Sequence, residues 1–178
     1  KSFGKIRADI AFGGDFYLIV KASDLGLEIH PDRAWEIVSA AAELRDGLKD
    51  HPVQHPTLAH VNEIYQIEII QDGDGETTDG KNAVICPPTV IDRSPCGTGT
   101  ASRMAMLSAK GELKVGDTFR HAGILDTVFK GHITGETTVG EFPAITCTVT
   151  GSAYVTGSFN FFLDPNDPFP AGFRLTGV

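Results

Sequence analysis

The sequence has few cysteines, an excess of acidic over basic residues, and no long apolar run. Its three cysteines are an odd number at wide spacing without a Cys-x-x-Cys pair, so neither a disulfide framework nor a zinc site is expected. A reducing cytoplasm is therefore the predicted location. The net charge of −8 argues against nucleic acid and anionic membranes as partners. No apolar run approaches the roughly 20 residues of a membrane span, and no basic-then-apolar signal segment occurs at the N-terminus.

Patterns for metal ions and nucleotides also fail to fit. The spacings of His51, His55 and His60 match no standard ligand set, and the prolines between them indicate a solvated loop. The pair Gly97-x-Gly99 lacks the third glycine and the later acidic residue of a dinucleotide fingerprint. We therefore expect neither a metal site nor a nucleotide cofactor.

The remaining composition is that of one globular domain with a real core, or of one domain and a fraction. Hydrophobic residues make up 41% of the chain and charged residues 21%. Twenty glycines and ten prolines indicate many turns, and hence a chain rich in strands. Because the chain begins with Lys1 rather than Met, we expect it to have been cut from something longer.

Strand patterns dominate the chain. Alternating or continuous apolar residues predict strands over about 5–12, 16–20, 64–70 and 82–86, and then one after another over 115–162. The turn residues between the third and fourth of these strands predict a hairpin. The last segment, 163–178, is typical of a loop.

Two helices are predicted. The first covers about 32–48, with Asp32 as its N-cap and with the apolar positions Trp35, Val38, Ala42 and Leu48 near helical spacing. The second covers about 98–110 and is small or apolar on most faces, as expected of a buried helix. Its N-terminus would then point its N–H groups into the interior or a cleft.

The most informative segment runs from Asp92 to Thr100 and places Cys96 directly before the second helix. A thiol there meets unpaired N–H groups and the positive end of the helix dipole, both of which favour the thiolate. The N–H groups of Gly97 and Thr98 would also hold a carboxylate or phosphate. The segment therefore offers a nucleophile or base beside an anion site.

Plain structural interpretations compete with these roles. A free cysteine is most often a small buried hydrophobe, and that is the interpretation we prefer for Cys147 in its strand pattern. Asp92 is either a turn residue at a strand end or an acceptor for a ligand's ammonium group. At Cys96 the glycines on its helix side favour function, since they are poor helix formers and allow a ligand to approach closely.

The segment from Asp92 to Thr100 resembles the second cysteine motif of the proline racemase family, which includes 4-hydroxyproline 2-epimerases and trans-3-hydroxyproline dehydratases. The resemblance extends to Asp9–Tyr17, Asn82–Cys86 and Ser158–Phe173, and so to essentially the whole chain. It implies an α+β fold similar to diaminopimelate epimerase. In that fold, each of two lobes wraps strands around a central buried helix.

The resemblance also implies a domain organisation. Residues 1–140 resemble the second lobe, and residues 141–178 resemble a C-terminal segment that returns to complete the first lobe. The family's first motif, with its own cysteine, appears nowhere in this sequence. We therefore expect either a truncated chain or a complementing first-lobe chain, and family members are commonly homodimers. Without a first lobe, residues 141–178 should expose apolar surface and cause chains to associate.

The mechanism implied by the resemblance inverts an α-carbon with two thiols and without pyridoxal phosphate or a metal. Cys96 would act on one face of the substrate, with Gly97 and Thr98 on its carboxylate and Asp92 on its ring ammonium. Two groups of similar pKa facing one carbon serve both directions of a reversible reaction. Cys96 argues against the dehydratases, which usually carry threonine at this position.

The preferred substrate is a finer question. In the family, the position six before Asp92 lines the pocket, and a bulky aromatic there accompanies proline as substrate. Here that position is Cys86, which would leave room for a ring hydroxyl. We favour 4-hydroxyproline epimerisation, with proline racemisation as the alternative. A hypothesis of another class is a lobe that is inactive by itself.

Overall fold

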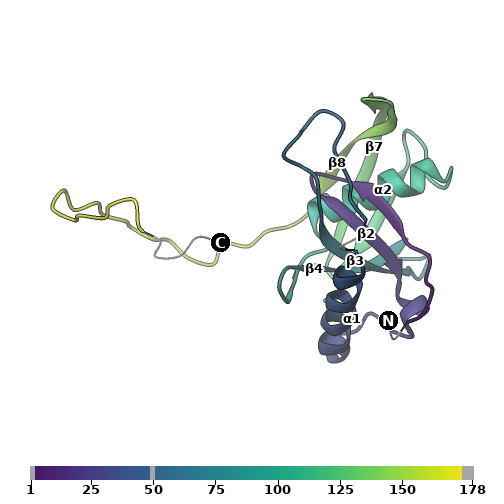
Figure 1. Cartoon of the computed structure of the whole chain (residues 1–178), viewed down its shortest axis with the longest axis horizontal. Coiled ribbons are helices and arrows are strands. Elements are labelled where there is room, and N and C mark those ends of the chain that lie inside the picture. The colour runs from purple at the N-terminus through teal and green to yellow at the C-terminus, as the bar shows by residue number, and fades with distance from the viewer. Residues whose placement is uncertain (1–2, 49–50, 174–178) are drawn as a thin grey trace.

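The body of the molecule is one curled sheet with two helices (Figure 1), in a computed structural model that describes residues 3–48 and 51–173. The elements in chain order are β1 (Asp9–Phe12), β2 (Phe16–Lys21), α1 (Ala34–Gly47), β3 (Ile64–Asp72), β4 (Gly80–Cys86), β5 (Val90–Ile91), α2 (Gly97–Ala109), β6 (Thr118–Ala122), β7 (Val128–Val139) and β8 (Phe142–Thr150). Short 3-10 turns occur at Ala22–Leu25 and Pro31–Arg33. Neither helix of this described part is long and apolar enough to cross a membrane.

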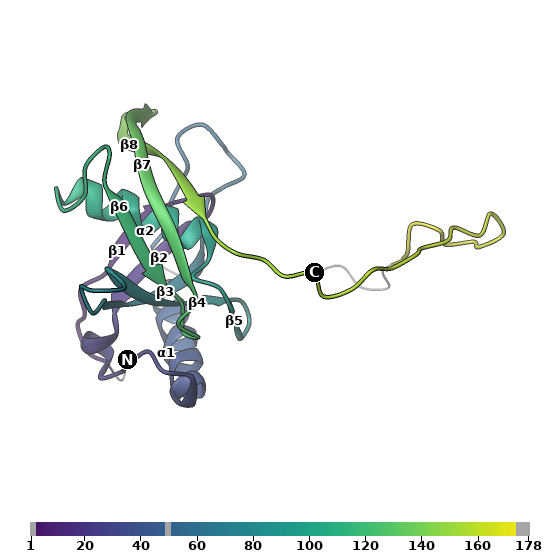
Figure 2. The same cartoon turned by 180° about the vertical axis from the view of Figure 1, so that it is seen from behind.

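The sheet has the strand order β1-β2-β3-β4-β6-β7-β8, with β5 paired to β4. The pairs β2–β3 and β4–β6 are parallel, and the other pairs are antiparallel. Helix α2 packs against strands from both ends of this order, namely β1, β2, β7 and β8, so the sheet curls around it (Figure 2). Helix α1 packs against β3, β4 and β5. The predicted α+β lobe, with strands around a central helix, is confirmed.

The two helices explain why the central strands are apolar on both faces. Successive side chains of a strand point to opposite faces. In β2, Leu18 and Val20 join the cluster that contains residues of α1, whereas Tyr17 and Ile19 join the cluster that contains Met106 of α2. The sheet therefore has a hydrophobic core on each face. For this reason the sequence of β2 is almost continuously apolar instead of alternating between apolar and polar residues.

Most of the predicted elements are present. The second helix, the strands near 16–20, 64–70 and 82–86, and the hairpin between the last two are confirmed. The first strand is shorter than predicted and begins at Asp9. The prediction of strands up to residue 162 is wrong after Thr150, where the last strand ends. Residues 151–162 are exposed and make no ladder, because no strand of the described chain lies beside them.

The predicted start of the first helix needs correction. The His30 side chain caps the turn that leads into α1, since its Nδ1 accepts a hydrogen bond from Asp32 N at 3.3 Å. Asp32 is therefore not the N-cap. Trp35 is 80% exposed, and Ala42 is exposed as well. The predicted apolar position Val38 is buried, together with Ile37, Ala40 and Ala41.

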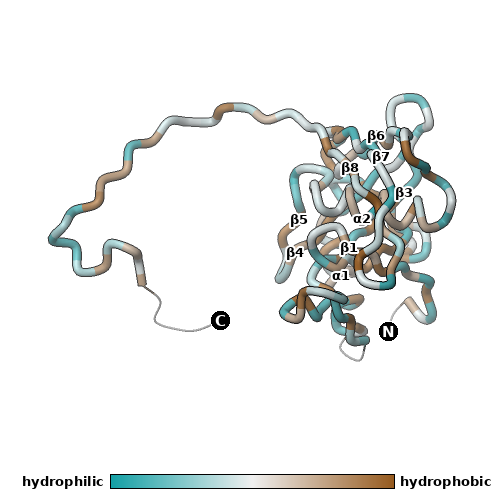
Figure 3. The backbone as a smooth tube through the Cα atoms, turned by 90° about the horizontal axis from the view of Figure 1, so that it is seen from above, coloured by the Kyte–Doolittle hydropathy of each residue, from teal (hydrophilic) through white to brown (hydrophobic). Residues whose placement is uncertain are grey.

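The segment that follows β8 leaves the body of the molecule and extends away from it (Figure 1). Apolar stretches recur along it in Figure 3. Its exposed large apolar side chains are Tyr154, Val155, Phe159, Phe161, Phe162, Leu163, Phe169 and Phe173. The expected exposed apolar surface is thus present within 151–173. Strand β8 itself pairs with β7 along its length, and the division at residue 140 stays a prediction.

Candidate active site

The loop between β5 and α2 is held by Asp92 and Ser94. Asp92 N donates to Val84 O at 2.9 Å, which extends the strand pairing by one residue. Asp92 Oδ1 accepts hydrogen bonds from Ser94 N at 2.8 Å and from Ser94 Oγ at 2.9 Å. Ser94 Oγ in turn accepts from Cys96 N at 3.0 Å. Asp92 therefore stabilises the turn through Oδ1, as predicted for a turn residue at a strand end. Its Oδ2 has no hydrogen-bond partner among the described residues.

Cys96 is the N-cap of α2 and has an unusual backbone conformation. Its φ is 64° and its ψ is 127°, a region that residues with a Cβ rarely occupy. Such strain persists only where the surroundings hold it in place, and it often accompanies function. The sulfur accepts a hydrogen bond from Gly99 N at 3.4 Å, and the Cys96 carbonyl accepts from Thr100 N at 2.9 Å.

These bonds leave the first two N–H groups of the helix without acceptors in the described chain. They belong to Gly97 and Thr98, both of which are exposed. Of the two predicted orientations, into the interior or into a cleft, the interior is therefore wrong, because this end of α2 lies at the surface of the lobe. The cleft stays a prediction. The two donors, the positive end of the helix and the half-buried Cys96 sulfur lie together.

The two glycines in the first turn of α2, Gly97 and Gly99, have different surroundings. A Cβ on Gly99 would lie 3.0 Å from a methyl carbon of Val84 and 3.2 Å from the Cβ of Cys96. Packing therefore explains this glycine without a ligand. A Cβ on Gly97 would meet no atom within 4 Å, so the space above Gly97 is open to an incoming molecule.

A buried polar network lies beneath the loop. Asn82 Nδ2 donates both to Pro95 O at 2.8 Å and to Glu68 Oε1 at 2.7 Å. Ser102 Oγ on α2 donates to Gly99 O at 2.9 Å. Burial raises the pKa of Glu68 to about 7, although the guanidinium of Arg103 acts in the opposite direction. The network fixes the carbonyl that precedes Cys96, and thereby the strained turn.

His121 completes this buried layer as a neutral group. It is fully buried, and its Nδ1 lies 3.0 Å from Thr100 Oγ1. Burial, reinforced by the Arg103 charge, lowers the pKa of His121 to about 3. Sequence reasoning missed this network. A signal was available in Glu68 and Asn82, which interrupt otherwise apolar strands and must therefore be paired.

Tyr17 is the other residue that sequence reasoning missed. Its side chain is fully buried on β2, and its hydroxyl oxygen lies 3.3 Å from Cys96 Sγ and 2.6 Å from Thr98 Oγ1. Burial, followed by the hydrogen bond with Cys96, raises the pKa of Tyr17. The phenol therefore keeps its proton. A tyrosine in an apolar strand was a signal, since a buried hydroxyl usually finds a partner.

The three cysteines fall into two environments. Cys86 is half-buried and packs in the same cluster as Cys96 and Tyr17. Burial raises the pKa of Cys86, and the charge of Cys96 acts in the same direction. Cys147 instead packs beside Met104 in the cluster between α2 and the β6–β8 strands. The pKa of Cys147 is raised by burial alone, as in an ordinary core position.

The histidine-rich loop serves a structural role around His55. This side chain is buried, and its Nδ1 accepts hydrogen bonds from Thr57 N at 3.2 Å and Leu58 N at 3.1 Å. His51 and His60 are exposed. Over residues 3–48 and 51–173, no three His, Cys, Asp or Glu side chains are grouped as metal ligands.

Comparison with known proteins places this geometry in a family. The sequence profile described as proline racemase matches residues 1–174. The chain belongs to the proline racemase family. Relatives that match this chain include proline racemases and 4-hydroxyproline epimerases, which are isomerases, and a trans-3-hydroxy-L-proline dehydratase. The resemblance carried by the segment from Asp92 to Thr100 is thereby confirmed.

Relatives with both expected activities match nearly the whole chain. The proline racemase of Clostridioides difficile is 46% identical over 173 residues, which are 97% of this chain and 52% of that protein. The 4-hydroxyproline 2-epimerase of Streptosporangium roseum is 38% identical over 174 residues, again 97% of this chain and 52% of the relative. This member of the proline racemase family thus spans about half the length of the curated relatives it matches.

A solved structure agrees with the fold. The hydroxyproline epimerase of Agrobacterium vitis, with bound trans-4-hydroxy-L-proline, superimposes with a TM-score of 0.83 at 32% sequence identity. The match covers 88% of this chain and 46% of that protein. The curled sheet around α2 is therefore one epimerase-like lobe.

Proposed function

We propose that this chain forms one lobe of a cofactor-independent racemase or epimerase that acts at the α-carbon of proline or 4-hydroxyproline. One observation carries the proposal: the Cys96 sulfur lies at the N-cap of α2, beside the unpaired N–H groups of Gly97 and Thr98. Asp92 presents a free carboxylate oxygen from the same loop. A base, an anion site and a cation site therefore lie within one short segment.

The proposed roles follow from charge. The N–H groups of Gly97 and Thr98 hold the substrate carboxylate, where negative charge grows as the α-proton leaves. Asp92 Oδ2 accepts a hydrogen bond from the ring ammonium. The Cys96 thiolate takes the α-proton and becomes a thiol. In the reverse direction, that thiol returns the proton to the same face.

Inversion requires a second acid on the opposite face. Cys86 does not fit this role, because it packs in the same cluster as Cys96. Cys147 does not fit either, because it packs in the cluster on the far part of the sheet. We propose that the second thiol comes from a first lobe, supplied by a complementing chain or by further sequence of the same protein.

The proposed division of the chain is 1–140 for the second lobe and 141–178 for the segment that returns to the first. The exposed apolar side chains within 151–173 support it, because Phe161 and Phe162 are at least 90% exposed. Side chains of this kind ordinarily pack against another surface. A homodimer is the alternative arrangement. The cytoplasm is the proposed location, since a thiol that transfers protons must stay reduced.

The preferred substrate in this proposal is 4-hydroxyproline. Cys86 supports it, because this small side chain packs near Cys96 and leaves room for a ring hydroxyl. For the complete two-lobed enzyme, we expect faster epimerisation of 4-hydroxyproline than racemisation of proline at equal concentration, measured by polarimetry or chiral chromatography. Equal or faster turnover of proline would favour the proline racemase alternative.

A second candidate is a lobe that is inactive by itself, and the absence of the family's first motif from the sequence favours it. The chain is incubated in deuterated water with each 4-hydroxyproline epimer, and α-deuterium is measured by mass spectrometry or NMR. Cys96→Ala is the control. Exchange by the chain alone that disappears in Cys96→Ala would rule out the inactive lobe. Exchange that needs an added first lobe would support it.

A further inference from the structure

Tyr17 connects the strand β2 to the reactive end of α2. Its hydroxyl forms a triangle with Cys96 Sγ at 3.3 Å and Thr98 Oγ1 at 2.6 Å, and the latter two atoms lie 3.5 Å apart. The ring belongs to the apolar cluster on this side of the sheet, which also contains Ile19 and Val84. The hydroxyl is therefore held at the sulfur by a rigid strand rather than by the loop.

We propose that Tyr17 is a positioning residue that donates a hydrogen bond to the Cys96 thiolate and fixes the Thr98 hydroxyl beside it. This role rests on the proposed function of Cys96 as a base, and it adds a residue that the proposed reaction does not name. Tyr17 touches the sulfur but does not exchange a proton with the substrate.

The hydrogen atoms of the triangle can follow the state of the sulfur. When Cys96 is a thiolate, Tyr17 donates to Sγ, Thr98 donates to the Tyr17 oxygen, and Gly99 N donates to Sγ from the helix. When Cys96 is a thiol, the Tyr17 hydroxyl can turn and donate to Thr98. Both arrangements satisfy the buried hydroxyl, so either state of the sulfur is accommodated without moving the backbone.

The acidic groups around the Cys96 sulfur explain why a neutral hydrogen-bond donor such as the Tyr17 hydroxyl matters there. The titratable groups around this site are Tyr17 on β2, Glu68 on β3, Cys86 on β4 and Asp92 in the loop. Among the cations, Arg103 acts on Glu68, Arg45 acts on Cys86, and Arg93 in the loop is exposed. Acidic neighbours disfavour a thiolate. Hydrogen bonds from Tyr17 and from the helix N-terminus therefore oppose that effect.

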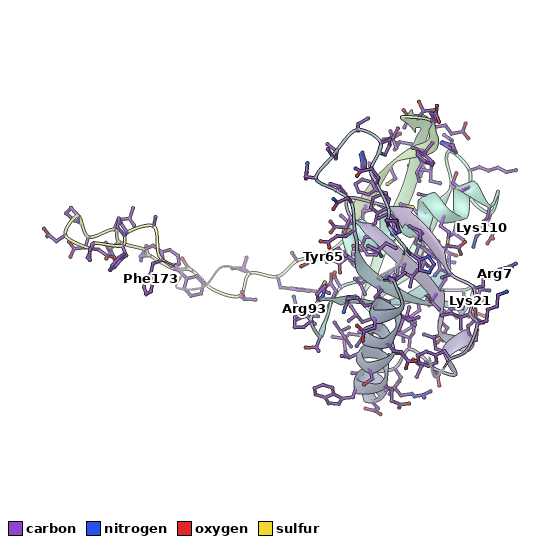
Figure 4. The ribbon with its side chains drawn as sticks, in the orientation of Figure 1. Arg7, Lys21, Tyr65, Arg93, Lys110 and Phe173 are labelled. Carbon is purple, nitrogen blue, oxygen red and sulfur yellow. The ribbon has the colours of Figure 1, made fainter. Side chains whose placement is uncertain are left out.

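A matched pair of variants isolates the hydroxyl. Tyr17→Phe removes one oxygen and leaves the buried ring in place. The control is Tyr65→Phe on the neighbouring strand β3, where the tyrosine lies at the surface and is 44% exposed (Figure 4). Thr98→Val is a second variant, which removes the hydroxyl that completes the triangle. Circular dichroism and urea unfolding verify that each variant is folded.

The experiment measures the rate at which iodoacetamide alkylates Cys96 as a function of pH, with each cysteine resolved by peptide mass spectrometry. For Tyr17→Phe we expect the midpoint of the Cys96 profile to rise by about 1 pH unit, and the rate at neutral pH to fall about tenfold, since hydrogen bonds to charged groups are the strong ones. Thr98→Val should shift the midpoint in the same direction by less. Tyr65→Phe should leave the profile unchanged.

Three results would overturn the inference. They are an unchanged Cys96 profile in Tyr17→Phe, an equal shift in Tyr65→Phe, and faster alkylation of Tyr17→Phe at every pH, which would make Tyr17 a shield instead of a donor. If Tyr17→Phe does not fold, the Thr98→Val variant decides: an unchanged midpoint of its Cys96 alkylation profile would overturn the inference. Alkylation needs no substrate. Failure of deuterium exchange even with an added first lobe would therefore reject the proposed function without affecting this result.

Discussion

At Cys96 the backbone conformation is costly, and the residues that hold it are polar and buried. A residue with a Cβ at positive φ costs on the order of 1–3 kcal/mol. Asn82 compensates by donating to the carbonyl of Pro95, and Glu68 holds Asn82 from the other side. The strain and the buried carboxyl group therefore belong to one arrangement, which presents the sulfur at the end of α2.

The buried carboxyl group gives a prediction of pH dependence. Burial raises the pKa of Glu68 to about 7 from its ordinary value of 4.5. Between these values the folded state holds more protons than the unfolded state, so this contribution to stability is lost as the pH rises. From pH 6 to pH 8 we expect the wild type to lose about 1 kcal/mol of unfolding free energy relative to Glu68→Gln. Urea denaturation at each pH measures it.

The control for this measurement is Glu63→Gln, which changes an exposed glutamate just before the same strand. It should follow the wild type at every pH. His121 contributes in the opposite direction below pH 6.5, because its lowered pKa favours the neutral form in the folded state. It lies 3.9 Å from Glu68, but above pH 6.5 its contribution to the slope is small. Parallel curves for wild type and Glu68→Gln would contradict the prediction.

At the scale of elements, α2 is positioned by a very close approach of the turn between β1 and β2. A Cβ on Gly13 would lie 2.2 Å from Thr98 O and 2.6 Å from Ser102 N. Both atoms belong to the backbone of α2, which cannot give way as a flexible side chain would. Gly13 thus allows the strand turn to touch the first turns of the helix.

We therefore expect Gly13→Ala to destabilise the chain by about 3 kcal/mol, as overpacking against backbone does. The midpoint of urea unfolding measures the effect. The matched control is Gly47→Ala at the end of α1, where a Cβ would meet no atom within 4 Å. Alanine there should be neutral or slightly stabilising, because it reduces the freedom of the unfolded chain. Equal stabilities of the two variants would refute the steric argument.

The elements also show where sequence patterns suffice and where they do not. Period and turn residues predicted α2 and the hairpin of β3 and β4, because those signals are local. The apolar positions of α1 were predicted only in part, since Val38 is buried but apolar residues occur on more than one side of this helix. Only packing against β3 to β5 decides that Ile37 is buried and Trp35 is not.

At the scale of the whole molecule, the exposed segment after β8 gives another prediction. Deletion of residues 153–178 removes the exposed aromatic side chains and leaves β8 paired with β7. We expect the thermal midpoint to change little and self-association to decrease, as measured by sedimentation velocity over a range of concentrations. The reason is that exposed apolar groups promote contacts between chains.

A double variant separates the effect of the exposed aromatic rings on association from the effect of the length of the segment. Phe161→Ser combined with Phe162→Ser keeps the segment but removes two of its most exposed rings. It should reduce association in the same direction as the deletion. If the shortened chain associates as strongly as the full chain, the surface responsible lies on the body. If the shortened chain unfolds, the segment belongs to the fold.

The sequence by itself determined α2, the central strands and the segment that carries Cys96, because helix caps, glycines and strand patterns are properties of neighbouring residues. The lobe and its family followed from the resemblance of that segment to the family's motif. The sequence also indicated Asp92, Gly97 and Thr98. Only the tertiary structure decided that Tyr17 meets the Cys96 sulfur and that Glu68 and Asn82 lie beneath the same loop. Those contacts join strands that are distant along the chain, and they depend on the curl of the sheet around α2. Burial then sets the protonation of these groups, which no local pattern encodes.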